Sequence, residues 1–269
     1  MPFTPSHAVV ALPFIRTPLP AAAVAIGAMT PDLPLFVRAF PERYDQTHSF
    51  AWVPVTMIVA LGLLLVWRGV LRPAVRELSP RRLAARLPAE WDAEAGGAVR
   101  AVFARRGQTR PSWRGTLLLL VALAIGIASH IAWDAFTHEG RWGETSLDLG
   151  VAWGPLPAYK WLQYGSSIVG LVIIAIWAAL WLRRRHPAPV ARVLPAWVRW
   201  SWWIALPVLL GGAWLIGFVH WGPFTADFTP QHLGYRVLPI ASAIWLGLGI
   251  LAALAVPIAR SRVRARVTA

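Results

Sequence analysis

The chain has 269 residues, of which 57% are hydrophobic, only 14% are charged and none is cysteine. Soluble domains usually carry about 25% charged residues, so this composition argues against a soluble globular protein, and its 17 tryptophans argue against disorder. The lack of cysteine excludes disulfides, thiolate metal sites and a cysteine nucleophile. A formal net charge of +14 would suit nucleic acid, but basic residues that flank apolar runs are typical of a membrane protein. We therefore expect an integral membrane protein with no nucleic-acid partner.

The first 49 residues contain an apolar stretch, residues 8–29, that three prolines and one arginine interrupt. Proline inside a helix removes a backbone hydrogen bond and clashes with the preceding turn. We therefore predict two short helices, residues 5–14 and 21–29, joined by a turn at residues 16–20. Such a hairpin can enter a membrane from one side when other helices cover its turn, so we expect a re-entrant element rather than a span.

Five later runs are apolar and long enough to cross a bilayer, which takes about 20 helical residues. They predict an all-α integral membrane protein with about five transmembrane helices in addition to the N-terminal hairpin. We expect residues 1–269 to form a single polytopic membrane domain. The runs cover residues 52–67, 116–137, 166–182, 200–220 and 237–259.

Arginine is concentrated in three segments, residues 68–114, 183–199 and 260–266. Loops rich in Lys and Arg stay on the cytoplasmic side of a membrane, and the other loops of this chain carry mostly carboxylates. Five crossings alternate correctly between the two kinds of loop. We therefore expect a multi-pass protein of the bacterial cytoplasmic membrane whose basic C-terminal tail, residues 260–269, lies in the cytoplasm.

The longest basic segment, residues 69–115, predicts a basic amphipathic cytoplasmic loop. We expect its helices to break at Pro80, at Pro88 and at the Gly96–Gly97 pair. Its arginines suit contact with anionic lipid headgroups, and nothing beyond charge supports nucleic-acid binding there. Membrane lipids are thus the expected partners of this protein.

Three ionisable residues spaced by four, His130, Asp134 and His138, lie at the end of the second apolar run. On a helix this spacing places all three on one face. Ionisable groups at membrane depth are costly and therefore indicate function by default. Imidazole and carboxylate groups on one helix face can chelate a divalent metal. The alternative is structural, because His130 and Asp134 can also form a hydrogen bond between helices.

Under this topology three further polar residues, His7, Asp32 and His48, fall on the same outer side of the membrane. Four of the seven histidines then converge with two aspartates. We expect these six residues to form a metal site, with Asp134 as its catalytic carboxylate. Nitrogen and oxygen ligands suit a divalent metal, Zn first and Mn or Fe as alternatives. A lone histidine near a helix end more often caps carbonyl groups, so the prediction depends on the whole set.

A second motif on the outer side, residues 156–167, contains Lys160, which is the only lysine of the chain. Its ammonium group can hold an anionic group such as a phosphate as a point charge. With Gln163 in the same motif, it is our candidate for substrate binding. The alternative is an anchor at the level of the lipid headgroups, together with the neighbouring aromatic residues.

The sequence contains five short motifs: the opening MPFTPSH, Thr30-Pro31-Asp32, Thr47-His48-Ser49, the run from Ser129 to His138 and the run from Tyr159 to Ser167. Together they resemble a bacterial membrane family, domain of unknown function 4184. That family is similar in turn to inner-membrane proteins described as metal-dependent hydrolases. The resemblance implies that His7, Asp32, His48, His130 and Asp134 bind metal, with His138 as an additional candidate.

These features favour a membrane-embedded metal-dependent hydrolase that opens to the outer leaflet and acts on a lipid-like phosphoester. The alternative is a non-enzymatic membrane protein in which a structural metal or polar cluster serves transport or envelope assembly. A proton or ion carrier that uses His130 and Asp134 is a third possibility. A carrier also needs polar groups in the inner half of the membrane, and residues 117–128 are apolar.

Overall fold

The computed structural model describes residues 4–36, 44–92 and 94–268, and its regular structure is helical except for one β-hairpin of two-residue strands. The Met-Pro-Phe that opens the first motif lies outside the described residues. The packing of the chain divides it into two units. The first unit comprises Met1–Val66 and Gly96–Arg184, and the second comprises Trp67–Ala95 and Arg185–Ala269. The domain boundaries expected from the sequence stay predictions.

Within the described residues, five helices are long and apolar enough to cross a membrane, which confirms the predicted number and the all-helical fold class. Each helix is longer than the apolar run that predicted it, because the residues at its ends continue the helical conformation. The side that each end faces and the re-entry of the hairpin stay predictions. The five helices are Phe50–Leu78, Trp113–Thr137, Ala158–Arg183, Ala196–Trp221 and Pro230–Arg260.

The N-terminal segment forms two short helices, as predicted. The first, η1 (Thr4–Arg16), is a 3₁₀-helix that contains Pro13, and the second, α1 (Ala21–Met29), is an α-helix. Proline has no N–H to donate, so it fits poorly inside a regular α-helix. Two short elements continue directly from α1: η2 (Thr30–Asp32) and α2 (Leu33–Phe36).

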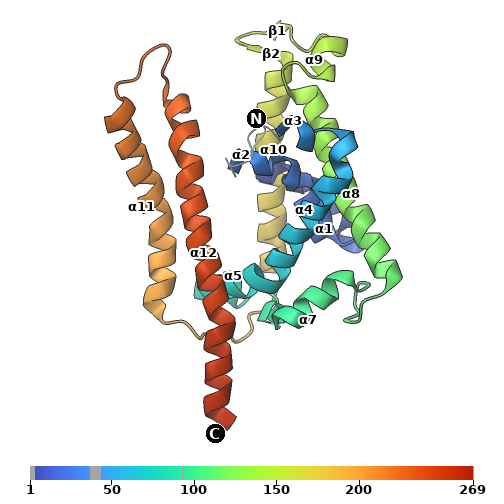
Figure 1. The fold of residues 1–269 in the computed structure, drawn as a ribbon, viewed down its shortest axis with the longest axis vertical. Coiled ribbons are helices and arrows are strands. Elements are labelled where there is room, and N and C mark those ends of the chain that lie inside the picture. The colour runs from blue at the N-terminus through green and yellow to red at the C-terminus, as the bar shows by residue number, and fades with distance from the viewer. Residues whose placement is uncertain (1–3, 37–43, 93, 269) are drawn as a thin grey trace. The chain divides into compact units, whose positions relative to one another are not determined.

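The three longest helices of the first unit are α4 (Val53–Val66), α8 (Trp113–Thr137) and α10 (Ala158–Arg183) (Figure 1). The hairpin pairs its two strands antiparallel, with Trp153 opposite Leu156. The shorter elements of this unit are α3 (Tyr44–Thr47), η4 (Phe50–Trp52), η7 (Ala101–Phe103), α9 (Trp142–Leu147), β1 (Ala152–Trp153) and β2 (Leu156–Pro157).

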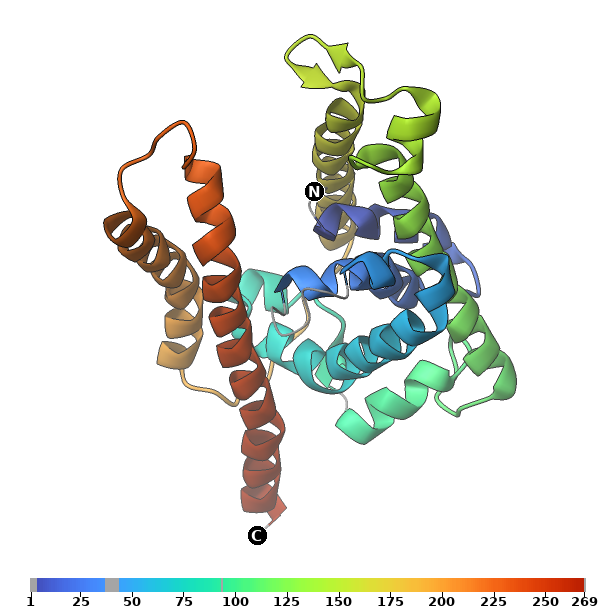
Figure 2. The same cartoon turned by 45° about the horizontal axis from the view of Figure 1, so that its top comes forward.

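The second unit is built on two long helices, α11 (Ala196–Trp221) and α12 (Pro230–Thr268), which run side by side in opposite directions (Figure 2). Both helices also contact α5 (Arg72–Leu78). The remaining elements of this unit are the π-helix η5 (Trp67–Leu71), α6 (Arg81–Ala84) and η6 (Ala89–Asp92).

The basic segment is a series of short helices with breaks at two of the three predicted positions. Pro80 separates α5 from α6, and Pro88 separates α6 from η6. The break predicted at Gly96–Gly97 is wrong, because both glycines lie inside α7 (Ala95–Arg100). Glycine weakens a helix by about 1 kcal/mol relative to alanine but, unlike proline, keeps its N–H and its hydrogen bond.

The tightest packing in the first unit is the crossing of α1 and α8. Ala23, Val24 and Ala28 of α1 are fully buried. At the crossing point Gly27 faces Gly126, and a Cβ atom added to Gly27 would lie 2.5 Å from the carbonyl oxygen of Leu123. Small residues let two helix backbones touch in this way. The contact fixes η2, which follows α1, beside the C-terminal third of α8.

This crossing predicts that Gly126→Ala destabilises the protein. The added methyl group would collide with the backbone carbonyl of Val24, which cannot turn aside as a side chain can. We expect the free energy of unfolding to fall by about 2 kcal/mol or more, measured by thermal unfolding in detergent. Gly62→Ala on α4 is the matched control, because its Cβ meets nothing within 4 Å. Equal melting temperatures for the two variants would contradict the predicted backbone contact.

Candidate metal centre

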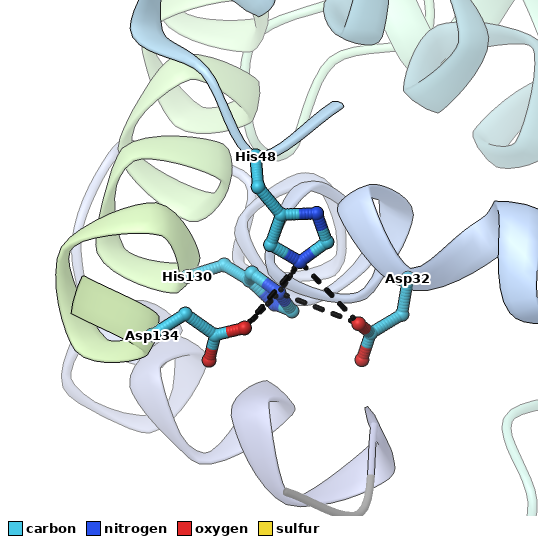
Figure 3. A group of neighbouring side chains, drawn as sticks. All are labelled: Asp32, His48, His130 and Asp134. Atoms are coloured by element: carbon cyan, nitrogen blue, oxygen red, sulfur yellow. Dashed lines mark hydrogen bonds and ion pairs between the residues drawn. The ribbon is translucent and has the colours of Figure 1, made fainter. Parts of the chain in front are cut away.

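Four buried side chains from three separate parts of the chain converge on one point (Figure 3). Asp32 ends η2, His48 follows α3, and His130 and Asp134 lie one turn apart on α8. Each of the four residues is at most 6% exposed. One nitrogen or oxygen atom from each lies within 4.8 Å of the other three. These are four of the six metal ligands predicted from the sequence.

Backbone carbonyl groups orient both imidazole rings of this group. Nδ1 of His130 is 2.7 Å from the carbonyl oxygen of Ala28, and Nδ1 of His48 is 2.8 Å from that of Tyr44. A carbonyl oxygen only accepts hydrogen bonds, so each Nδ1 carries a proton and the neutral ring keeps its lone pair on Nε2. The two Nε2 atoms face each other at 3.0 Å. Two lone pairs at this distance repel unless a proton or a metal cation lies between them.

The two carboxylates approach this pair of nitrogens from opposite sides, as Figure 3 shows. Oδ1 of Asp32 is 3.6 Å from Nε2 of both His48 and His130, and Oδ2 of Asp134 is 3.4 Å from both. A tetrahedral zinc site with ligands at about 2.1 Å has edges of about 3.4 Å between its ligand atoms. Five of the six edges between the ligand atoms, at 3.0 to 3.6 Å, are close to this value, so these residues fit a small divalent ion.

Two threonine hydroxyl groups hold the loop that carries Asp32. Thr4 donates a hydrogen bond of 2.6 Å to Oδ2 of Asp32, the carboxylate oxygen that is not shared with the histidines. Thr47 donates one of 2.8 Å to the carbonyl oxygen of Pro31. Hydrogen bonds of this kind orient metal ligands. Neither role could be predicted from the sequence, although Thr4 and Thr47 each stand in one of the motifs described above.

His7, also predicted as a ligand, lies beside this group of four rather than within it. Its ring stacks on that of His130 with 4.0 Å between centroids, and its Nε2 is 3.7 Å from Oδ1 of Asp134. Both of these atoms are buried and neither has a hydrogen-bond partner among the described residues. His7 therefore adjoins the second carboxylate oxygen of Asp134, which the tetrahedron does not use.

His138 lies at the edge of the centre. The predicted common helical face holds for His130 and Asp134, but α8 ends at Thr137 and His138 has an extended backbone. Regular helical backbone has ended at this cap position, and Nδ1 of the ring lies 3.2 Å from the hydroxyl group of Thr137. Its Nδ1 is still 3.5 Å from Oδ2 of Asp134, and 17% of its side chain is exposed.

A cavity of about 600 Å³ is lined by His138 and by both predicted substrate-binding residues, Lys160 and Gln163. The amide nitrogen of buried Gln163 lies 3.3 Å from Nε2 of His138. Arg141, which the sequence analysis did not select, also lines the cavity and forms an ion pair of 3.0 Å with Asp45. No carboxylate in the described parts of the chain forms an ion pair with Lys160, so its charge is available to an anion.

The pKa values of the site depend on the contacts between its charges. Burial disfavours the carboxylate form of Asp32, but contacts with His48 and His130 outweigh burial and hold its pKa below the usual value. Burial also disfavours the charged ring of His48, yet its contacts with Asp134 and Asp32 raise the pKa of His48 to about 9. Without a metal, the ring of His48 therefore carries a second proton and a positive charge at neutral pH.

We predict that the purified protein binds one divalent metal ion per four-residue centre and that His48→Ala/Asp134→Ala abolishes binding. The variant removes two of the four ligands. Elemental analysis of detergent-purified protein after incubation with zinc, manganese or iron measures this directly. His186→Ala is the matched control, because His186 is exposed and distant in sequence from every ligand. Metal that stays bound in the double variant would refute the site.

The raised pKa of His48 predicts a pH dependence of metal binding. A metal must displace the proton of His48, so its apparent affinity increases with pH until about pH 9, where the ring becomes neutral by itself. Below that value we expect about a tenfold gain in affinity per pH unit. Competition with a chelating dye of known pH dependence measures the slope. An affinity that does not change with pH would contradict protonated His48.

Comparison with known proteins agrees with the sequence motifs. The family model described as Domain of unknown function (DUF4184) matches residues 1–259, which is nearly the whole chain. No curated protein and no solved structure matches the chain. The match includes all of the residues that form the metal centre and its adjoining cavity. The chain therefore belongs to the DUF4184 family.

Proposed function

We propose that this protein is a membrane-embedded, metal-dependent hydrolase that acts on a lipid-like phosphoester. The observation that carries the proposal is the buried group of nitrogen and oxygen atoms, which His138 connects to a cavity lined by two cationic side chains, Arg141 and Lys160, and two carboxylates, Asp45 and Glu139. Buried charged groups are costly, and their assembly in an apolar protein indicates a function that needs them. The distant similarity to metal-dependent hydrolases noted in the sequence is consistent with this assignment.

In this proposal Asp32, His48, His130 and Asp134 hold the ion, which is Zn or else Mn or Fe. When bound, such an ion supplies Lewis acidity, which polarises a phosphoryl oxygen and makes water more acidic. Asp134 is the catalytic carboxylate, because its Oδ1 faces His7 and its Oδ2 contacts His138. His7 and His138 complete the six predicted ligands as neighbours that can join the coordination.

The cavity beside the centre suits the phosphoryl group of a substrate. Lys160 supplies a positive charge that lacks a carboxylate partner among the described residues, and Gln163 supplies an amide. An ammonium group is a common phosphate ligand in proteins. In this arrangement the two residues would hold the phosphoryl group of the substrate beside the metal centre.

A second cavity supports a lipid rather than a soluble substrate. It has a volume of about 380 Å³, lies between η1, α8 and α10, and includes His7 together with apolar side chains such as Val9, Val169 and Ile173. His7 and His138 both adjoin Asp134. His7 lines the apolar cavity and His138 lines the polar one, so both cavities border the metal centre. An amphiphile with a hydrocarbon chain and a phosphate headgroup matches both.

We place the protein in the bacterial cytoplasmic membrane with the metal centre toward the outer leaflet. The arginine-rich segments support this orientation, since they belong on the cytoplasmic side and alternate with the loops near the centre. The N-terminal segment, η1 and α1, then enters and leaves the membrane from the outer side. The C-terminal tail of the protein and the basic segment lie in the cytoplasm beside anionic headgroups.

A structural metal is the second candidate, and the same tetrahedron favours it. Four protein ligands close a tetrahedral zinc site, whereas catalytic zinc sites usually keep one position open for water or substrate. A protein of this kind would serve transport or envelope assembly without turnover. The two candidate functions make different predictions for Lys160 and Gln163, which line the cavity but do not hold the metal. A hydrolase needs them for turnover, and a protein with a structural metal has no turnover for them to affect.

Lipid turnover by the metal-loaded protein tests the proposal. We expect release of phosphate or headgroup from phospholipids in mixed micelles, lowered more than about a hundredfold in His48→Ala, which loses a ligand. Lys160→Gln keeps the metal but loses its contact to the phosphate, so kcat/KM should fall about tenfold. Product release is measured by mass spectrometry, with His186→Ala as the variant expected to match the wild type.

The outcomes separate the two candidates. Stoichiometric metal without turnover of any phospholipid, together with a lower melting temperature after chelation, would overturn the hydrolase proposal in favour of a structural metal. Turnover that persists after chelation and in His48→Ala would show that the centre is not the site of reaction. Equal kcat/KM in Lys160→Gln and the wild type would remove Lys160 from substrate binding.

A further inference from the structure

The second unit contains a cavity of about 920 Å³ whose charged side chains are all arginines. It lies where α5 ends, α6 begins and the linker before α11 passes close by. The first turns of α11 complete its wall with Trp200 and Trp203. Arg81 comes from α6, Arg192 from the linker and Arg199 from α11.

Hydrogen bonds to one buried carboxylate hold the linker in place. Glu77 is 1% exposed and accepts hydrogen bonds from the backbone N–H groups of Val193 and Leu194 at 3.3 and 3.1 Å. It also forms an ion pair of 3.6 Å with Arg199. Arg192 donates a hydrogen bond of 2.8 Å to the carbonyl oxygen of Ser79. Arg192 and Arg199 are therefore held in place around the cavity.

The positive charge of this cavity is not neutralised by the protein. Glu77 provides one negative charge near three guanidinium groups. Burial, followed by the charge of Arg199, lowers the pKa of Arg192, as expected where cations are crowded together. A guanidinium has five N–H donors, and the side chain of Arg81 makes no hydrogen bond or ion pair with any part of the chain that the structure describes. The cavity thus offers both charge and free donors to an anion.

The position of the cavity along the candidate spans identifies the kind of anion. Its walls come from Leu78, the last residue of the span Phe50–Leu78, and from the first turns of the span Ala196–Trp221. Trp203 donates a hydrogen bond of 2.9 Å to the carbonyl oxygen of Leu78 and joins the two ends. Tryptophan and arginine at the ends of spans lie at the level of the lipid headgroups. At this depth the abundant anion is the phosphate of a phospholipid.

We propose that this cavity binds the phosphate group of an anionic phospholipid through Arg81, Arg192 and Arg199. Basic cavities between helices at a membrane surface bind such headgroups, and the indole rings of Trp200 and Trp203 suit the adjacent glycerol and acyl carbons. The site is independent of the metal centre, and it binds lipid without cleaving it.

Lipid binding by the full chain in detergent tests this site. Native mass spectrometry or fluorescence titration with cardiolipin and phosphatidylglycerol, against phosphatidylcholine, measures the affinity. Arg81→Gln should bind the two anionic lipids about fivefold more weakly than Arg82→Gln, because one guanidinium near a headgroup contributes about that factor. Arg82 is the matched control, since it is equally exposed on the same helix but does not line the cavity. Arg81 makes no side-chain contact that folding needs, and Arg81→Lys should restore most of the affinity.

Three results would overturn the proposal. Equal affinities in Arg81→Gln and Arg82→Gln would mean diffuse attraction to the surface rather than a site. Equal binding of phosphatidylcholine would exclude selection for an anionic headgroup. Displacement of the lipid by millimolar inorganic phosphate would identify a free phosphate as the ligand. Arg81→Gln and Arg82→Gln share an unaltered metal centre, so the difference between their affinities reports this cavity alone and keeps this test separate from that of the hydrolase.

Discussion

The metal centre depends on the backbone contact between α1 and α8. Because Gly27 and Gly126 have no side chains, the two helices approach until their peptide groups touch. The carbonyl oxygen of Ala28 then lies within hydrogen-bond distance of His130. Asp32 ends η2, which directly follows α1 in the chain, so the crossing also positions Asp32. A wider crossing would move both away from α8. Close packing of small residues thus sets the geometry of a charged site.

The residue types of the site could be predicted from the sequence, and its geometry could not. The spacing of His130 and Asp134 on a helix indicated a shared face, and the arginine clusters placed His48 and Asp32 on the same side. The carbonyl oxygens that orient the rings belong to Ala28 and Tyr44, and every residue type offers such a group. Contacts through the backbone leave no pattern in the sequence, so they appear only in the structure.

The same distinction explains where the prediction of helices succeeded and failed. The five long helices follow from apolar composition and length, which dominate in a membrane. Pro80 and Pro88 ended short helices as expected, because the missing N–H is a property of the residue itself, although the long helices accommodate Pro207, Pro239 and Pro257. Gly96 and Gly97 did not end a helix. Glycine costs a helix only about 1 kcal/mol, and the neighbouring residues outweigh this cost. Thr4 and Thr47 were visible as motif residues, but a hydroxyl can donate to many acceptors.

The wide sequence separation of the ligands has a consequence for biogenesis. His48 and His130 are 82 positions apart, so the centre cannot form until the ribosome has completed α8. At roughly 5 to 20 residues per second, the first segment must wait about 4 to 16 seconds for its partners. During that interval His7, Asp32 and His48 require water or an insertion factor to cover their polar groups. The four side chains of the centre can therefore meet only after α8 has been made.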